Sequence, residues 1–145
     1  MTNDVQKWGP WAGGLITGAE SEHDELLHPS PRIYAVSPSG GVSFVKLGIA
    51  PEDFDLIKSN QDLYISAYND GMILKLSRNW LTNYIGDMLV TQEGLSPFAP
   101  AVFIAKWNPT NSAFETRRIS APAFANSGFE HATFAPINLP NLPLP

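Results

Sequence analysis

Proline and glycine interrupt this chain so often that long helices are excluded. The 145 residues contain 13 prolines and 11 glycines, spread from end to end. Each of them breaks helical periodicity, because proline lacks an amide hydrogen and glycine weakens a helix. Only residues 22–27 and 77–83 leave room for a helix, and one turn is expected in each. An apolar content of 43% still indicates a folded chain, so the sequence predicts an all-β protein.

Short runs rich in β-branched and aromatic residues lie between these breaks. Residues 50–77 show the pattern best, because DLYISAY and MILKLS flank Asn69-Asp70-Gly71, a sequence typical of a hairpin turn. Pro38 to Gly41 predicts another turn. Such short strands are typical of a sandwich, barrel, prism or propeller. Ten strands are expected, at residues 14–20, 32–37, 42–47, 54–57, 62–68, 72–77, 87–93, 101–108, 114–120 and 129–137.

Two stretches of the chain are alike. Residues 11–20 align with residues 85–93, allowing one gap, and each runs from a glycine turn into an apolar strand that ends at a glutamate. An aromatic-containing strand follows in both copies, and each copy closes on a charged pair before an apolar run, Glu52-Asp53 and Glu130-His131. The copies are about 70 to 78 residues apart, more than one propeller blade of about 40 to 50 residues. Residues 61–77 lie between them and would supply the missing blade.

Residues 51–76, PEDFDLIKSNQDLYISAYNDGMILKL, resemble a blade of the NHL, strictosidine-synthase-like and SMP-30-like β-propellers. The segments WAGGLITGAE, GDMLVTQEG and FEHATFAPI are similar to uncharacterised bacterial propeller proteins. The resemblance implies propeller-like repeated antiparallel sheets, about three in number, whereas a closed propeller has about four to eight blades. A partial propeller exposes sheet faces and strand edges, so self-association or other blades of a longer propeller are the expected partners. A compact β-sandwich or β-prism is the alternative fold.

Acidic residues near the ends of the expected strands form the first candidate site. In a propeller, such carboxylates can converge on the central channel and hold Ca²⁺, which prefers about six to eight oxygen ligands. The SMP-30-like resemblance implies a channel metal and lactone hydrolysis, with a carboxylate or a histidine as general base. The alternative is that the acids cap turns and stay solvated. The candidate metal-binding residues are Glu20, Glu52, Asp53, Glu93, Glu130 and His131.

Aromatic residues form the second candidate site. Trp11, Tyr64 and Trp107 could stack on sugar rings, although packing in the core is the ordinary role of such side chains. Residues 7–14, KWGPWAGG, are similar to the first strand of jacalin-related lectins, whose fold is a β-prism. The Gly-x-x-x-Asp sugar loop of that family is missing, because no aspartate follows Gly128.

Charge and composition narrow the function classes. The net charge is −5 and the nine basic residues are scattered, so nucleic-acid binding is not expected. Arg117-Arg118, the one adjacent basic pair, is interpreted as part of a solvated strand face. The chain has no cysteine, which excludes disulfides and thiolate metal sites. No signal peptide or membrane span is visible, so a cytoplasmic location is the default, although a processed or truncated exported protein would look the same.

The sequence thus predicts one all-β repeat domain over residues 1–137, followed by a proline-rich tail at residues 138–145. The expected function is a propeller-like binding or assembly module of unknown ligand. A metal-dependent SMP-30-like hydrolase of the lactonase type and a carbohydrate-binding jacalin-like lectin are the alternatives. Ca²⁺ is the one expected cofactor.

Overall fold

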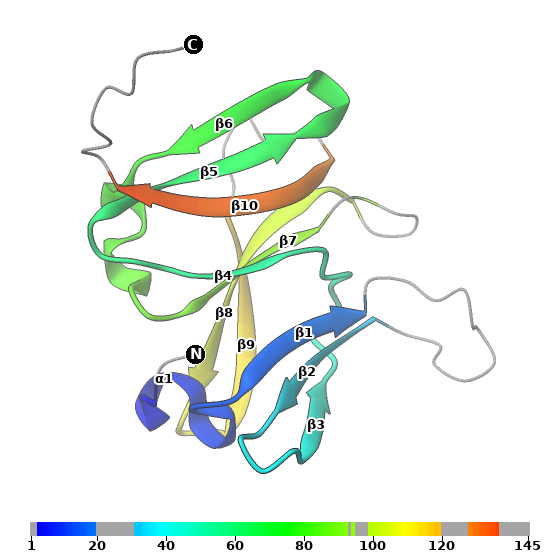
Figure 1. Cartoon of the computed structure of the whole chain (residues 1–145), viewed down its shortest axis with the longest axis vertical. Helices are drawn as coiled ribbons and strands as arrows, with labels where there is room; N and C mark the ends of the chain where they lie inside the picture. Colours follow the sequence, from blue (N-terminus) through cyan, green and yellow to red (C-terminus); the bar gives the residue numbers. More distant parts are fainter. Residues whose placement is uncertain (1–2, 20–30, 93, 95–98, 120–127, 137–145) are drawn as a thin grey trace, which may run out of the picture.

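A computed structural model of the chain describes residues 3–19, 31–92, 94, 99–119 and 128–136. Within these residues the fold is mostly β, with three small antiparallel sheets and one short α-helix (Figure 1). The strands are β1 (Leu15–Ala19), β2 (Arg32–Val36), β3 (Val42–Val45), β4 (Phe54–Leu56), β5 (Gln61–Ala67), β6 (Met72–Leu76), β7 (Met88–Gln92), β8 (Ala101–Asn108), β9 (Ala113–Ile119) and β10 (Phe129–Pro136). All ten expected strands are therefore present, with their ends within two residues of the expected positions.

The helical pieces are short, as the density of proline and glycine predicts. Single 3₁₀ turns at η3 and η4 confirm the turn expected within residues 77–83, whereas residues 22–27 lie outside the described part of the chain. None of the described helices is long and apolar enough to span a membrane. The helical pieces are α1 (Val5–Trp8), η1 (Gly9–Trp11), η2 (Tyr68–Asp70), η3 (Arg78–Trp80) and η4 (Thr82–Tyr84).

The strands form sheet A, in the order β1-β2-β3, sheet B, in the order β4-β7-β8-β9, and sheet C, in the order β10-β5-β6. The two alike stretches each begin a three-stranded antiparallel meander, β1-β2-β3 and β7-β8-β9. The strand that closes each stretch leaves its own meander, because β4 pairs with β7 and β10 pairs with β5. The expected hairpin turn at Asn69-Asp70-Gly71 is confirmed, and Gly71 takes a left-handed φ of 61° there.

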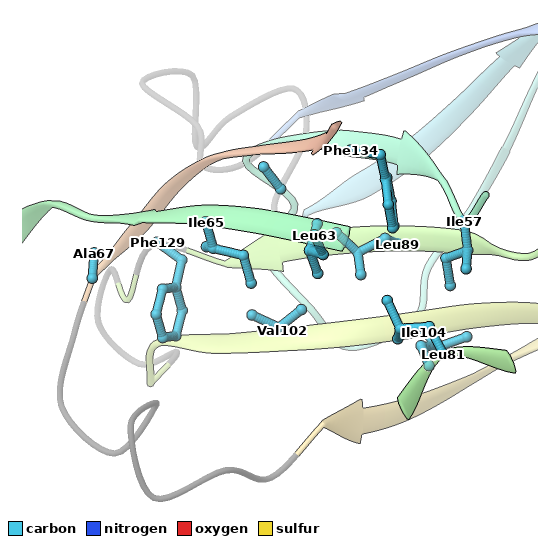
Figure 2. Close-up of a cluster of buried hydrophobic side chains, with 11 residues drawn as sticks. Ile57, Leu63, Ile65, Ala67, Leu81, Leu89, Val102, Ile104, Phe129 and Phe134 are labelled. Atoms are coloured by element: carbon cyan, nitrogen blue, oxygen red, sulfur yellow. The ribbon is translucent and has the colours of Figure 1, made fainter. Parts of the chain in front are cut away.

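Sheet B lies between the other two sheets (Figure 1). All five residues of β7 are buried, since successive side chains enter opposite cores. Leu89 packs with sheet C in the first core, which Figure 2 shows, while Met88 and Val90 pack with sheet A, α1 and η1 in the second. Sheet C, which holds residues 61–77, thus lies at one end of the molecule, so the order of the sheets in space differs from their order along the chain. In the described residues no closed or propeller arrangement is identified.

Asp55 of β4 and Asp53, directly before this strand, join sheet B to sheet C. β10 pairs with β5 along one edge only, so alternate amides on its other edge need acceptors. Asp53 accepts the amide hydrogen of Ala132 at 2.9 Å, and Asp55 accepts that of Phe134 at 3.3 Å. The carboxylates therefore take the place of a neighbouring strand and hold β10 against β4.

Helix α1, which was not predicted from the sequence, is attached by a partly buried ion pair. Asp4 caps the helix by accepting the amide hydrogen of Gln6, and Trp8 is buried beneath it. The Lys7 ammonium lies 2.8 Å from a carboxylate oxygen of Asp87, whose side chain is fully buried. The pair fixes α1 to the start of β7.

Asp62 of β5 makes an ion pair across the β5–β6 hairpin and a hydrogen bond to the start of η3. The carboxylate of Asp62 lies 2.7 Å from the Lys75 ammonium and accepts the amide hydrogen of Arg78 at 3.0 Å. These contacts, the Lys75 hydrogen bond first, lower the pKa of Asp62 below its ordinary value of 3.8. The charged form of Asp62 is thus favoured in the folded protein.

We expect Lys7→Met to lower the free energy of unfolding by about 2–3 kcal/mol, because it leaves the buried Asp87 carboxylate without its cation. Urea unfolding at neutral pH measures the change. Lys58→Met is the matched control, since its ammonium is exposed and 3.9 Å from Asp55, and a cost below about 0.5 kcal/mol is expected. Equal costs for both variants would contradict a special role of the Lys7 pair.

We expect Asp62→Asn to lower the melting temperature at pH 7 and to make little difference at low pH. Because the folded-state pKa is lowered, the charge of Asp62 stabilises the fold fully above its unfolded pKa, near 3.8, and this contribution is lost as the pH falls through the folded pKa. Thermal unfolding of both proteins from pH 7 down to pH 2 checks this. A difference that stays constant over that range would show that the charge is not its cause.

Candidate functional site

Thr91 of β7 brings three of the six candidate metal-binding residues into one hydrogen-bond network. Its hydroxyl accepts the amide hydrogen of Asp53 at 3.1 Å and donates to the carbonyl oxygen of Glu130 at 3.3 Å. Its carbonyl oxygen accepts the amide hydrogen of Glu52 at 2.9 Å. Glu52-Asp53 and Glu130-His131, the pairs that close the two alike stretches, are therefore neighbours in space. The hydrogen bonds that link them through Thr91 use their backbone atoms and not their side chains.

The Asp53 carboxylate is occupied by backbone amides. One oxygen accepts the amide hydrogen of Phe54 at 2.8 Å and the other accepts that of Ala132 at 2.9 Å. His131 is exposed. Among the described residues, no three or more histidine, aspartate or glutamate side chains lie together so as to hold a metal ion. Two other candidates, Glu20 and Glu93, lie outside the described residues, and the Ca²⁺ site stays a prediction of the resemblance.

The three candidate sugar-stacking residues lie in separate places. Trp11 is buried, and its ring centroid is 4.6 Å from that of Phe114 in the core between sheets A and B. Trp107 packs edge-on against the same ring at 5.2 Å and covers Gly9 so closely that a Cβ there would clash with the indole. Tyr64 lies on β5, where the Lys75 ammonium is 5.8 Å from its ring centroid. The structure therefore does not bring these rings together.

Sheet A has an apolar face that no described residue covers. Ile33 and Ala35 of β2 point into the core and are almost fully buried, so their neighbours point the opposite way. On that opposite face Leu15, Val42 and Phe44 are 68%, 66% and 52% exposed. The register places Leu15, Val36 and Val42 in one row across the sheet and Thr17, Tyr34 and Phe44 in the next. We call these six residues the outer face of sheet A.

Side-chain contacts organise the outer face of sheet A. The rings of Tyr34 and Phe44 lie opposite each other with centroids 6.0 Å apart, as in a cross-strand aromatic pair. The Arg32 guanidinium lies over the Phe44 ring, 4.4 Å from its centroid. The Arg32 guanidinium is thus held against an aromatic ring at the edge of the apolar rows.

The outer face of sheet C is different in character. There the cross-strand partners are Tyr64 with Lys75 and Ser66 with Ile73, and Thr133 lies opposite Tyr64 on the other side. Ile73, at 74% exposure, is a single aliphatic residue in polar surroundings. Isolated apolar residues of this kind are common on protein surfaces, whereas contiguous apolar rows mark interaction sites. Sheet A is therefore the better candidate for a binding surface.

The sequence analysis did not single out this face, although a signal for it was present. IYAV carries apolar side chains at four successive positions and VSFV at three of four, and this is typical of a sheet buried on both sides. A sheet with one solvated face would show polar residues at positions 34, 36, 42 and 44. Those positions hold Tyr, Val, Val and Phe instead.

Comparison with known proteins assigns no family to the chain. No family model matches it, and no curated protein or solved structure matches it either.

We expect Asp53→Ala to lower the free energy of unfolding by about 2–4 kcal/mol, because it removes two charge-assisted hydrogen bonds and leaves the Ala132 amide without its acceptor. Glu52→Ala is the control at the neighbouring position, since Glu52 joins the network through its backbone amide, and a change within about 0.5 kcal/mol is expected.

The same unfolding measurements, repeated with Ca²⁺ and with a chelator, test the metal site. A structural role for Asp53 predicts that its cost is the same in both conditions. A Ca²⁺-dependent rise in the melting temperature that Glu52→Gln or Glu130→Gln abolishes would support the calcium site instead.

Proposed function

We propose that the protein is a binding or assembly module that associates with a second copy of itself through the outer face of sheet A. One observation carries the proposal: the cross-strand rows of that face are apolar and exposed, although sheet A already packs its other face in the core. A sheet with two apolar faces is stable in water when a second sheet covers the open one, about 10 Å away. The docking of another sheet is therefore the role that fits this surface.

The charges favour a copy of the same chain as the partner. None of the six residues of the outer face of sheet A is charged, but Arg32 alternates with Ile33 on β2 and points to the same side, with its guanidinium over the Phe44 ring at one end of the face. Strand register puts Arg32 and the Leu15 row at opposite ends of the face. Two copies can be related by a two-fold axis that lies in the plane of the interface and is perpendicular to the strands. This symmetry places the two Arg32 side chains at opposite ends of the interface. The apolar rows then meet without contact between like charges.

The expected partial propeller agrees with this proposal. Blades of a propeller pack face to face, and sheet B is already covered in this way on both sides. A second copy would add further sheets beyond sheet A and extend the series. The hydrolase and lectin alternatives stay predictions of the resemblances, since no metal-binding cluster and no grouping of the three stacking residues occur in the described residues.

We expect the protein to run at about twice the 15.8 kDa of one chain in sedimentation equilibrium. Phe44→Lys should shift it to monomer mass by raising the dissociation constant of the dimer about 100-fold or more, because an ammonium buried in an apolar interface next to Arg32 has no partner.

Ile73→Lys on the outer face of sheet C is the matched control, with the same added charge at another exposed apolar position, and it should leave the mass unchanged. Circular dichroism verifies that both variants are folded. A wild-type protein that stays monomeric at high concentration, or a dimer that Phe44→Lys leaves intact, would contradict the proposal.

A further inference from the structure

A hollow of about 250 Å³ lies between β9 and the 3₁₀ turns η3 and η4. Its floor is apolar and rigid, since Leu81 and Ile104 belong to the core between sheets B and C and are 1% and 2% exposed. Figure 2 shows these two side chains side by side at one end of that core. The hollow forms where η3 and η4, in place of a further strand, cover the β9 side of sheet B.

The walls of the hollow are aromatic. Trp80 of η3 lines it and remains 70% exposed, so most of the indole surface is free to contact a ligand. Tyr84 of η4 lines it as well and is half-buried. Flat, apolar walls over an apolar floor favour the body of an aromatic or branched aliphatic ligand.

One arginine is fixed at the rim. Arg117 lies opposite Ile104 in the register of β8 and β9, so its side chain is on the same face of sheet B as the hollow. Its guanidinium lies 5.6 Å from the centroid of the Tyr84 ring and donates a hydrogen bond to the Tyr84 hydroxyl. A guanidinium has five N–H donors, so this bond orients the group and leaves other donors available.

The surroundings of the hollow suit an anion. Arg117 lines it and no acidic residue does, in a chain whose net charge is −5. Arg118 also borders the hollow, but its side chain lies on the opposite face of sheet B. Arg118 comes next on the strand, and its guanidinium donates to the carbonyl oxygen of Pro100 at 3.0 Å. Arg117 is therefore the cation that faces the hollow. Its contact with Tyr84, which also lines the hollow, orients its guanidinium.

We propose that this hollow binds a carboxylate that carries an apolar, preferably planar, body. The guanidinium of Arg117 would hold the carboxylate by paired hydrogen bonds, while Trp80 and Tyr84 contact the body over the Leu81–Ile104 floor. The volume admits one amino-acid side chain or a small aromatic acid. A free organic acid and the C-terminal residue of a peptide share this chemistry.

The hollow lies on the sheet C side of sheet B, whereas the outer face of sheet A lies beyond the opposite side of sheet B. The inference is thus independent of the proposed self-association, and a monomeric protein could bind the same ligand.

Titration with 3-phenylpropionate, followed by tryptophan fluorescence and by calorimetry, tests the site. We expect saturable binding with a dissociation constant on the order of a millimolar, the range that about eleven non-hydrogen atoms provide. The alcohol 3-phenylpropanol lacks the carboxylate and should bind at least about ten-fold more weakly. Inorganic phosphate lacks the apolar body and should also bind more weakly.

Variants then assign the binding to the hollow. Arg117→Gln should weaken binding about ten-fold or more, and Trp80→Ala should weaken it while leaving the fold intact, because its side chain is mostly exposed. Lys106→Gln, which removes an exposed cation from β8 of the same sheet, is the charge-matched control and should bind as the wild type does. Thermal unfolding verifies that each variant is folded.

Two further ligands separate the sources of the carboxylate. Tighter binding of a peptide ending in phenylalanine than of 3-phenylpropionate, lost on amidation of its C-terminus, would assign the site to peptide termini, and the reverse order would assign it to free organic acids. Absence of saturable binding, equal binding of the alcohol, tighter binding of phosphate, or an Arg117→Gln variant that binds as the wild type does would overturn the proposal.

Discussion

The connection between β4 and β10 is the contact on which the rest of the structure depends. Strand β10 has one neighbouring strand, and Asp53 and Asp55 supply acceptors for two amides on its other edge. Charged acceptors make strong hydrogen bonds in partly buried surroundings, so two side chains can substitute for part of a missing strand. Through them sheet C is held at a fixed position on sheet B. The core around Leu63, Ile65 and Phe129 closes as a result (Figure 2).

The position of β7 explains the asymmetry of the molecule. With both of its faces buried, this strand is shared by the two cores, and sheets A and C each have one face left over. The outer face of sheet C is polar, in keeping with contact with water, while that of sheet A is apolar. Because only the free face of sheet A is apolar, the proposed association involves sheet A and not sheet C.

Much of the local structure could be predicted from the sequence, because it depends on neighbouring residues. Alternating apolar positions and turn residues such as Asn69-Asp70-Gly71 specify strands and hairpins without reference to the rest of the chain. The pairing of β4 with β7 could not be predicted in this way, since a whole hairpin separates them and no local signal selects the partner. The role of Asp53 depends in turn on an amide 79 residues away, so its charge alone suggested a metal ligand.

The aromatic and basic residues show the same limit. Trp11 and Trp80 both end short 3₁₀ turns, yet one is buried and the other is exposed, because a sheet covers only the first. Arg117 and Arg118 are neighbours in the sequence, but only Arg117 contacts Tyr84, since successive residues of a strand point to opposite faces. The basic pair was interpreted as solvent-facing, and the hollow beside it depends on turns that precede β9 by some thirty residues.

The pairing of β4 and β10 with strands outside their own meanders also bears on how the chain is made. During synthesis, β1, β2 and β3 can pair as soon as they emerge, but β4 must wait until β7 has been translated. The β5–β6 hairpin remains two-stranded until β10 leaves the ribosome. A nascent chain therefore keeps apolar surface and strand edges open for most of its elongation, the condition under which chaperone binding and misassembly compete with folding.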